Sequence, residues 1–308
     1  MSLAATSQVN AGPDTVICTG EITTLQGTGP IQYTYEWTSV PHDPTISNPT
    51  ILTPTVQPVV PTDYTLTGRS VSMSNLVING NFETGSNSGF TSSYTYSPGP
   101  NGLWNEGTYA ITDDASYNHN NFTCNNNHTP YGIYFMAING AQQANVVIWT
   151  ETIVGITPNT EYEFSTYVAS LSSSNPALLQ FKINGVLLGE PFQASPITCQ
   201  WNRFFEKWNS GTATSATISI VNQNTVGNGN DFSLDDINFS KVTYFEDECT
   251  VTIAPIPTST FNMATQTCSN DTVIITYTGT ASPSALFNWD FGIATVTGGP
   301  VPDPYKAI

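Results

Sequence analysis

The side chains of this chain that are best suited to binding chemistry are aromatic and polar groups spread between positions 104 and 222. Sugar binding requires flat aromatic faces for the apolar C–H surface of a pyranose ring, and amides or carboxylates for its hydroxyl groups. The residues that offer such groups are Trp104, Tyr109, Tyr117, His119, Trp149, Tyr167, Gln180, Arg203 and Asn222. Together they predict a carbohydrate site, although any single aromatic could instead belong to the core or to an ordinary surface.

Alternation along three predicted strands divides these residues between two faces. In the strand over 145–153, Val146 and Ile148 lie on one face, and Trp149 and Glu151 lie on the other. In the strand over 161–168, Tyr162, Phe164 and Val168 lie opposite Tyr167. In the third strand, Leu179, Phe181 and Ile183 lie opposite Gln180 and Lys182. The second faces could share the floor of a groove, or could form a solvated sheet face. Trp201 and Trp208, which flank the segment RFFEK, are expected in the core.

The polar loop from Asp113 to Thr129 carries Cys124 with His119 and His128 nearby. Three chemistries are possible for this cysteine. A disulfide to Cys199 would order the loop, a His/Cys group could hold a metal, and a reactive thiol could act in catalysis. No closely spaced ligand pair supports the metal, and a reactive thiol needs cationic neighbours that this loop lacks. The disulfide is therefore the favoured interpretation.

Enzymatic activity is not expected. Glycoside hydrolysis needs two carboxyl groups about 5 to 9.5 Å apart, with pKa values that differ. Acidic residues are present, but no motif pairs them.

Composition narrows the possible partners. The chain has 23 acidic residues against 6 Lys and Arg, a formal net charge of -17, so its surface repels nucleic-acid backbones and anionic lipid headgroups. No apolar run approaches the roughly 18 residues of a membrane span. Only 9% of the residues are charged, and the abundance of Thr, Ser, Asn and Gly is typical of extracellular β-sheet proteins.

The middle of the chain, from Asn75 to Ser240, predicts a two-sheet jelly roll. It contains eight strand candidates: LVING, GIYFMAING, NVVIWTETI, EYEFSTYVASL, LLQFKI, RFFEKWNS, ATISIVN and FSLDDINFS. The clearest hairpin surrounds Asn184-Gly185, because this pair favours a type I′ turn.

The segments on either side of this middle part predict one β-domain that is interrupted and then resumed. Ala11 to Gly68 alternates in short Thr-rich runs between Gly and Pro, and Glu246 to Pro255 supplies one more strand. Trp37 has the place of the core tryptophan of an immunoglobulin-like sandwich, and Asp63-Tyr64 resembles its tyrosine corner. The antibody pattern would require Cys at position 66, where this chain has Leu66. The alternative is a separate N-terminal domain, with Cys249 in a linker.

This interrupted domain resembles the PKD-like or Ig-like repeats of large secreted proteins from gliding bacteria. The opening GPDTVICTG and the strand TDYTLTG carry the resemblance, which implies that Cys249 is the displaced final cysteine of the repeat. A second, incomplete repeat begins after Pro257, where Asn288 to Gly292 (NWDFG) resembles the WDFGDG core motif of PKD domains. We expect the chain to be a monomeric fragment of a larger secreted or cell-surface protein.

The middle part resembles galactose-binding-like carbohydrate-binding modules of the family 4, 9 and 22 type, through its opening NGNFE and its ending LDDINF. In those modules the first and last strands lie side by side, which suits insertion into a hairpin. The resemblance implies a structural calcium ion held by Glu83 and Asp235, with Asn81 or Asp236 as further ligands. The alternative is that these acids cap turns and face water.

The five cysteines allow many pairings; the expected pairs are Cys18 with Cys249, in line with the resemblance to the repeats, and Cys124 with Cys199, which would order the polar loop. Each bridge then lies inside one predicted domain, and Cys268 has no partner.

The sequence thus predicts an all-β protein. Its parts are an Ig/PKD-like sandwich over 5–70 and 244–256, an inserted jelly roll over 72–243, and an incomplete PKD-like domain over 257–308. The predicted function is non-catalytic binding of a polysaccharide or glycan by the jelly roll, displayed for adhesion on spacer domains. The alternatives are a purely structural, calcium-stabilised spacer and, less favoured, an accessory part of a polysaccharide hydrolase.

Overall fold

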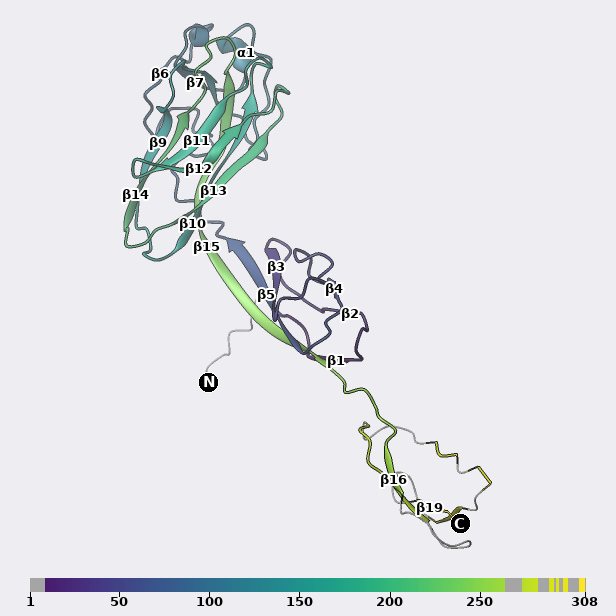
Figure 1. Ribbon diagram of the computed structural model, residues 1–308. Helices are drawn as coiled ribbons and strands as arrows, with labels where there is room; N and C mark the ends of the chain where they lie inside the picture. Colours follow the sequence, from purple (N-terminus) through teal and green to yellow (C-terminus); the bar gives the residue numbers. More distant parts are fainter. Residues whose placement is uncertain are drawn as a thin grey trace. The chain divides into compact units, whose positions relative to one another are not determined.

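The computed structural model describes residues 9–263, 273–281, 288–290, 292–293, 296–298 and 305–307, and these are almost entirely strands and connecting loops (Figure 1). The chain divides into two compact units. One comprises Ser70–Thr243 and is called the central unit below; the other comprises Met1–Arg69 together with Tyr244–Ile308. Among the described residues, no helix is long and apolar enough to cross a membrane.

The central unit is a sandwich of two sheets. The first sheet has the order β13 (Asn202–Asn209), β10 (Glu161–Ser170), β15 (Phe232–Ile253), β8 (Phe135–Asn139), β7 (Thr108–Thr112) and β6 (Thr95–Tyr96). The second has the order β12 (Val186–Gln193), β11 (Leu178–Ile183), β14 (Ser215–Asn222) and β9 (Val146–Val154). All neighbours are antiparallel except β6 and β7. The short helices η1 (Gly102–Trp104) and α1 (Ala115–Asn118) lie in the long connections.

An aromatic core holds the two sheets together. Phe164 of β10 stacks on Phe181 of β11 with ring centroids 4.0 Å apart, and Phe181 stacks on Phe204 of β13 at 3.8 Å. All three side chains are buried. Alternation correctly placed Phe164 and Phe181 inward, and a face-to-face sandwich of this kind agrees with the jelly-roll prediction at the level of fold class.

The first segment of the central unit differs from its prediction. The run LVING does not form a strand, although its first amide, of Leu76, and its last carbonyl, of Gly80, are hydrogen-bonded to β15. The side chain of Asn75 also bonds to β15. Its Nδ2 donates to the Ile237 carbonyl at 2.8 Å, and its Oδ1 accepts from the Phe239 amide at 3.0 Å. The backbone then turns at Asn79 and Phe82, both with φ of 56°.

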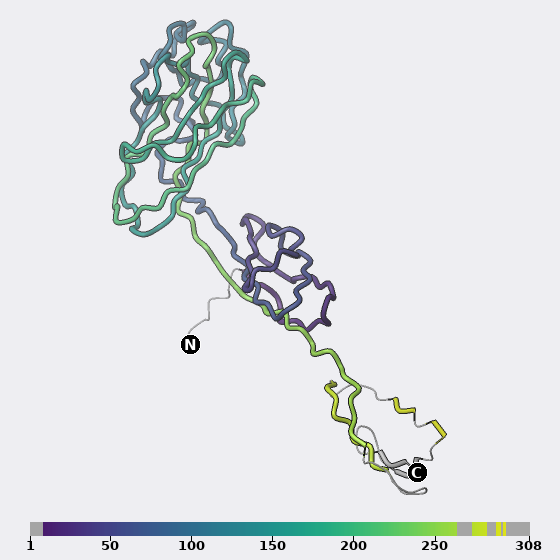
Figure 2. Tube along the Cα trace, in the orientation of Figure 1, coloured from purple at the N-terminus to yellow at the C-terminus, as the bar shows by residue number. Residues whose placement is uncertain are grey.

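The two ends of the central unit lie side by side, as the trace in Figure 2 shows. The Ser72 amide donates to the Lys241 carbonyl at 2.8 Å, and the Leu76 amide donates to the Phe239 carbonyl at 3.0 Å. The expected adjacency of the termini is therefore present in the structure.

The other unit contains β1 (Thr15–Ile17), β2 (Thr23–Thr24), β3 (Thr34–Val40), β4 (Thr55–Val56), β5 (Thr62–Val71) and the Tyr244–Ile253 part of β15. β1 runs parallel to β15, with Ile17 opposite Ile253, and β3 is antiparallel to β5. Trp37 is buried, as predicted, in a small core that also contains Cys249 and Val251. The Tyr64 hydroxyl donates to the Asp43 carboxylate, whereas a tyrosine corner bonds to the backbone.

A further sheet has the order β16 (Phe261–Met263), β17 (Val273–Tyr277), β19 (Tyr305–Ala307) and β18 (Val296–Gly298). Two predictions concern residues outside the described ranges. These are Cys268, which was expected to have no disulfide partner, and Phe291 of the PKD-like motif NWDFG.

Candidate functional site

A polar groove of about 530 Å³ lies on the outer face of the first sheet of the central unit. Its floor is formed by outward-facing side chains of three neighbouring strands: Glu163, Ser165 and Tyr167 of β10, Arg203 of β13, and Asp236 and Asn238 of β15. Asn75, Asn79 and Asn81 line the groove from the segment that precedes the first sheet strands. We refer to this feature as the groove.

Strand alternation explains why the floor is polar. In β10 the side chains of Tyr162, Phe164 and Val168 enter the core, so Glu163, Ser165 and Tyr167 point outward. The predicted division of faces in this strand is thus confirmed. Glu163 and Ser165 were not among the predicted site residues, although the same alternation would have found them.

A charged pair lies at one position on the floor. The Arg203 guanidinium donates to the Glu163 carboxylate, whose side chain is only 2% exposed, and it also lies 4.6 Å from the centroid of the Phe205 ring. A buried carboxylate needs such a partner, and a guanidinium held in place presents its remaining N–H groups to a ligand.

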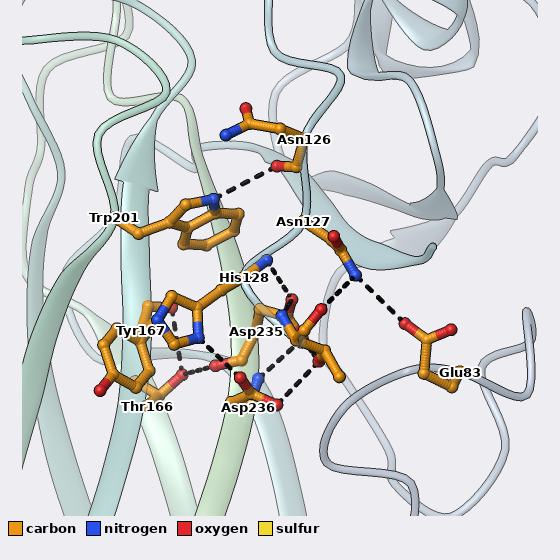
Figure 3. A network of polar contacts seen from close by, with 10 residues as sticks. Glu83, Asn126, Asn127, His128, Thr166, Tyr167, Trp201, Asp235 and Asp236 are labelled. Carbon is orange, nitrogen blue, oxygen red and sulfur yellow. Dashed lines mark hydrogen bonds and ion pairs between the residues drawn. The ribbon is translucent and has the colours of Figure 1, made fainter. Parts of the chain in front are cut away.

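Beside this charged pair, the groove floor carries an aromatic ring, that of Tyr167. The His128 imidazole stacks on the Tyr167 ring with centroids 3.4 Å apart and planes at 17°, and its Nδ1 is 2.6 Å from Asp236 Oδ2 (Figure 3). Trp201 meets His128 edge-on, and its Nε1 donates to the Asn126 carbonyl at 3.2 Å. His128 was predicted only as part of the polar loop, because no local pattern shows that the loop reaches β10.

Three acidic residues hold this loop in place. Fully buried Asp235 accepts the amides of His128 at 2.8 Å and Thr129 at 3.1 Å, and the Thr129 hydroxyl donates to Asp236 at 2.8 Å (Figure 3). Glu83 accepts the amides of Ile133 and Tyr134 at 2.8 and 3.0 Å. Burial, together with the neighbouring Asp236 charge, raises the pKa of Asp235 to about 7 despite these amide donors.

The predicted calcium ligands come from this same set. Their oxygen atoms suit calcium chemically, but the described residues contain no group of three or more His, Cys, Asp or Glu side chains placed to hold a metal ion. Asn81 Oδ1 accepts the Glu83 amide at 3.5 Å, and the carboxylates already accept the hydrogen bonds given above. In this structure these residues anchor the loop, and the calcium ion stays a prediction.

Four of the predicted sugar-binding residues lie away from any surface groove. Tyr109 and Trp149 are buried in the aromatic core, and Asn222 is buried with its Nδ2 donating to the carbonyls of Ala141, Gln143 and Asn224. Gln180 is 7% exposed, and its Nε2 donates to the Gly189 carbonyl. Trp149 turns inward because the pairing of β14 with β9 shifts register between Ile220 and Val221, which breaks the alternation.

Of the two alternatives for the second faces of these strands, the shared groove floor does not occur. β10 belongs to one sheet, whereas β9 and β11 belong to the other, so their outer faces lie on opposite sides of the sandwich. Only Tyr167 and Arg203 of the predicted set line the groove, while Trp104 and His119 line a different pocket and Tyr117 is exposed.

Cys18, Cys124, Cys199 and Cys249 are free thiols in the structure, so neither predicted disulfide is formed there. Cys124 and Cys199 nevertheless belong to one apolar cluster beneath the polar loop. Burial raises the pKa of the Cys124 thiol, and its hydrogen bond with Cys199 adds to this effect. A thiol with a raised pKa is a poor nucleophile, which agrees with rejecting catalytic cysteine chemistry.

No protein-family model and no curated protein matches this sequence. Solved structures with a similar chain path include the CBM22-1 xylan-binding domain of Paenibacillus barcinonensis Xyn10C, with 17% identity over 53% of this chain and 91% of that domain, at a TM-score of 0.35. TmCBM61 in complex with β-1,4-galactotriose matches with 13% identity over 56% of this chain and 99% of its own, also at 0.35. A family 16 carbohydrate-binding module matches with 15% identity over 54% and 99%, at 0.33. These structures are carbohydrate-binding modules, but likenesses at such TM-scores carry no argument about the ligand of this chain.

Proposed function

We propose that the central unit binds a polysaccharide or glycan chain in the groove without catalysing a reaction. The observation that carries this proposal is the combination in the groove of an aromatic ring, Tyr167, with a guanidinium and side-chain amides. A pyranose offers an apolar C–H face and hydroxyl groups, and these are the complementary surfaces. The volume of about 530 Å³ suits a ligand of a few sugar rings.

The groove carboxylates favour binding over hydrolysis. Glu163 is engaged by Arg203, and Asp236 is engaged by His128 and Thr129. A glycosidase needs one carboxyl that delivers a proton and a second that attacks or activates water. Both groove carboxylates serve instead to position neighbouring side chains.

The test is binding of the full chain to a glycan array and to insoluble polysaccharides, with Tyr167→Ala and Arg203→Ala as groove variants. Loss of one stacking or one bidentate contact is expected to weaken binding about tenfold or more. Tyr117→Ala, which removes an exposed phenol that lines neither the groove nor the pocket around Trp104, is the matched control. Retention on no glycan would reject the proposal in favour of a structural spacer, and release of new reducing ends would reveal a hydrolase.

We propose further that the glycan site is displayed at a cell surface by the Ig/PKD-like unit, as an adhesin module. The supporting observation is the continuity of β15, whose Phe232–Thr243 part belongs to the central unit and whose Tyr244–Ile253 part belongs to the other. Retention of labelled chain on intact cells, competed by the glycan identified on the array, would support display for adhesion. Equal retention of Tyr167→Ala would contradict it.

We propose, second, that a structural calcium ion binds near Asp235. A buried carboxylate beside Asp236, with its pKa raised to about 7, would be stabilised in its charged form by a divalent cation. Binding would require the amides of His128 and Thr129 to give up part of their hydrogen bonds. We expect calcium to raise the thermal midpoint relative to EGTA, and equal midpoints would reject the ion.

A further inference from the structure

A second pocket of the central unit has a volume of about 300 Å³, and its lining differs from that of the groove in chemical character. Its lining includes Trp104 at the end of η1, Glu106 in the loop that follows, His119 directly after α1, Asn139 at the end of β8 and Asp231 directly before β15. None of the described residues that line it is Lys or Arg. We refer to it as the Trp104 pocket.

Three stacked rings form one side of the Trp104 pocket. Trp104 stacks on His119 with centroids 5.2 Å apart and planes at 24°, and His119 stacks on Phe122 at 4.4 Å and 29°. One face of the indole is therefore covered by His119. The Trp104 side chain is still 62% exposed, so its opposite face is available to a ligand. Burial lowers the pKa of His119, which keeps this imidazole neutral near pH 7.

Hydrogen-bond acceptors without a cation partner form another side. Asn139 is 7% exposed, its Nδ2 donates to the Leu103 carbonyl at 2.7 Å, and its Oδ1 is buried without a hydrogen-bond partner among the described residues. Among the described residues, the one hydrogen bond that Asp231 Oδ1 accepts is a long one of 3.3 Å, from the Gly140 amide. Burial raises the pKa of Asp231 to about 7, and the charge of Glu106 contributes in the same direction. An unpartnered acceptor in such a place calls for a donor from outside the protein.

We propose that the Trp104 pocket binds a cationic amine carried on a sugar ring, that is, an amino sugar without an N-acetyl group. The ring would lie on the free face of Trp104, and the ammonium would be placed among Glu106, Asp231 and Asn139 Oδ1. An ammonium supplies three donors and a positive charge, and it is attracted both by carboxylates and by the face of an indole. A neutral sugar supplies donors but leaves the repulsion between the two carboxylates uncompensated. The volume is sufficient for about one sugar unit.

The experiment is calorimetric titration of the full chain with glucosamine, N-acetylglucosamine and glucose at low ionic strength. We expect glucosamine to bind at least tenfold more tightly than the other two, and added salt to weaken it. Trp104→Ala, Glu106→Gln and Asp231→Asn should each weaken glucosamine binding about tenfold. Glu190→Gln, which neutralises an exposed acid of β12, controls for net charge and should leave binding unchanged.

Three outcomes would overturn the proposal: no binding of glucosamine at millimolar concentration, equal binding of glucosamine and glucose, or equal loss in Glu190→Gln. Tyr167→Ala separates this site from the groove, since it should leave glucosamine binding unchanged. If Tyr167→Ala abolishes glucosamine binding, the amine belongs to the groove. Circular dichroism and thermal midpoints of each variant identify any loss that arises from misfolding.

Discussion

Single acidic residues in this protein are held in surroundings that favour their protonated form. Glu151 of β9 is an example: its carboxylate accepts the Ile78 amide at 3.1 to 3.2 Å, yet burial raises its pKa from 4.5 to about 7. Burial likewise raises the pKa values of Asp231 and Asp235 to about 7. In a chain with a net charge of -17, these residues make the folded state sensitive to pH near neutrality.

The sign of this dependence follows from proton linkage. Folded Glu151 keeps its proton up to about pH 7, whereas the unfolded chain releases it near pH 4.5, so the folded state binds more protons between these values. Stability should therefore fall as the pH rises from 4.5 to 7. We expect a lower thermal midpoint at pH 8 than at pH 5, and a smaller difference in Glu151→Gln, measured by calorimetry. Glu190→Gln is the control; a difference unchanged by Glu151→Gln would contradict the assignment.

At the scale of the residue, the sequence predicted side-chain orientation only where the strand is regular. Tyr167 and Phe164 were assigned to the correct faces because β10 pairs with β13 without interruption from Glu161 to Val168. The irregularity between β10 and β15 adds its extra residue to β15 and leaves the alternation of β10 intact. Trp149 was not, because an irregularity in one strand pair changes the face of every residue beyond it. His128 contacts Tyr167 and Asp236 from a segment that is distant in sequence, a contact for which a single sequence contains no signal.

Among the elements, the hairpin of β11 and β12 follows most directly from local sequence. Asn184 and Gly185 have φ of 51° and 84°, and the strands pair from Ile183 with Val186 onward. This is the type I′ geometry predicted for Asn-Gly. A Cβ added at Gly185 would meet no atom within 4 Å, so any cost of substitution is conformational.

Gly185→Ala should therefore destabilise the central unit by about 1 kcal/mol, because an L-residue is strained at this φ. The matched control is Gly99→Ala, where an added Cβ also meets nothing within 4 Å but the backbone is not left-handed. Chemical denaturation measures both variants. Equal stability of the two would show that steric freedom, and not backbone conformation, decides the cost.

Strand content was largely predictable. Of the eight runs proposed as strands, the seven from GIYFMAING to FSLDDINFS contain strands in the structure. The run LVING does not contain a strand: only its two ends bond to β15 through the backbone, and the chain turns at Asn79. The division of strands between two sheets was not predictable, since it depends on pairings between β10 and β15 or β11 and β14 that are far apart in sequence. That division decides which outward faces form the groove.

For the whole molecule, each of the two units has a hydrophobic core of its own. The central unit is organised around Phe164 and its stacked neighbours, and the other around Trp37, with Tyr64, Leu66 and Val251. Because each core is contributed by one unit, we expect two unfolding transitions, although β15 contributes strands to both.

Phe164→Ala and Trp37→Ala test this expectation, because truncating a buried aromatic costs about 3–5 kcal/mol in the unit that contains it. Scanning calorimetry should show Phe164→Ala lowering the midpoint of one transition and Trp37→Ala that of the other, with glycan binding lost only where the central unit has melted. A single transition lowered by both substitutions would mean that the shared strand couples the units into one cooperative structure. In that case, changes in the unit around Trp37 would also alter the proposed glycan affinity, and the groove could not be treated as an independent module.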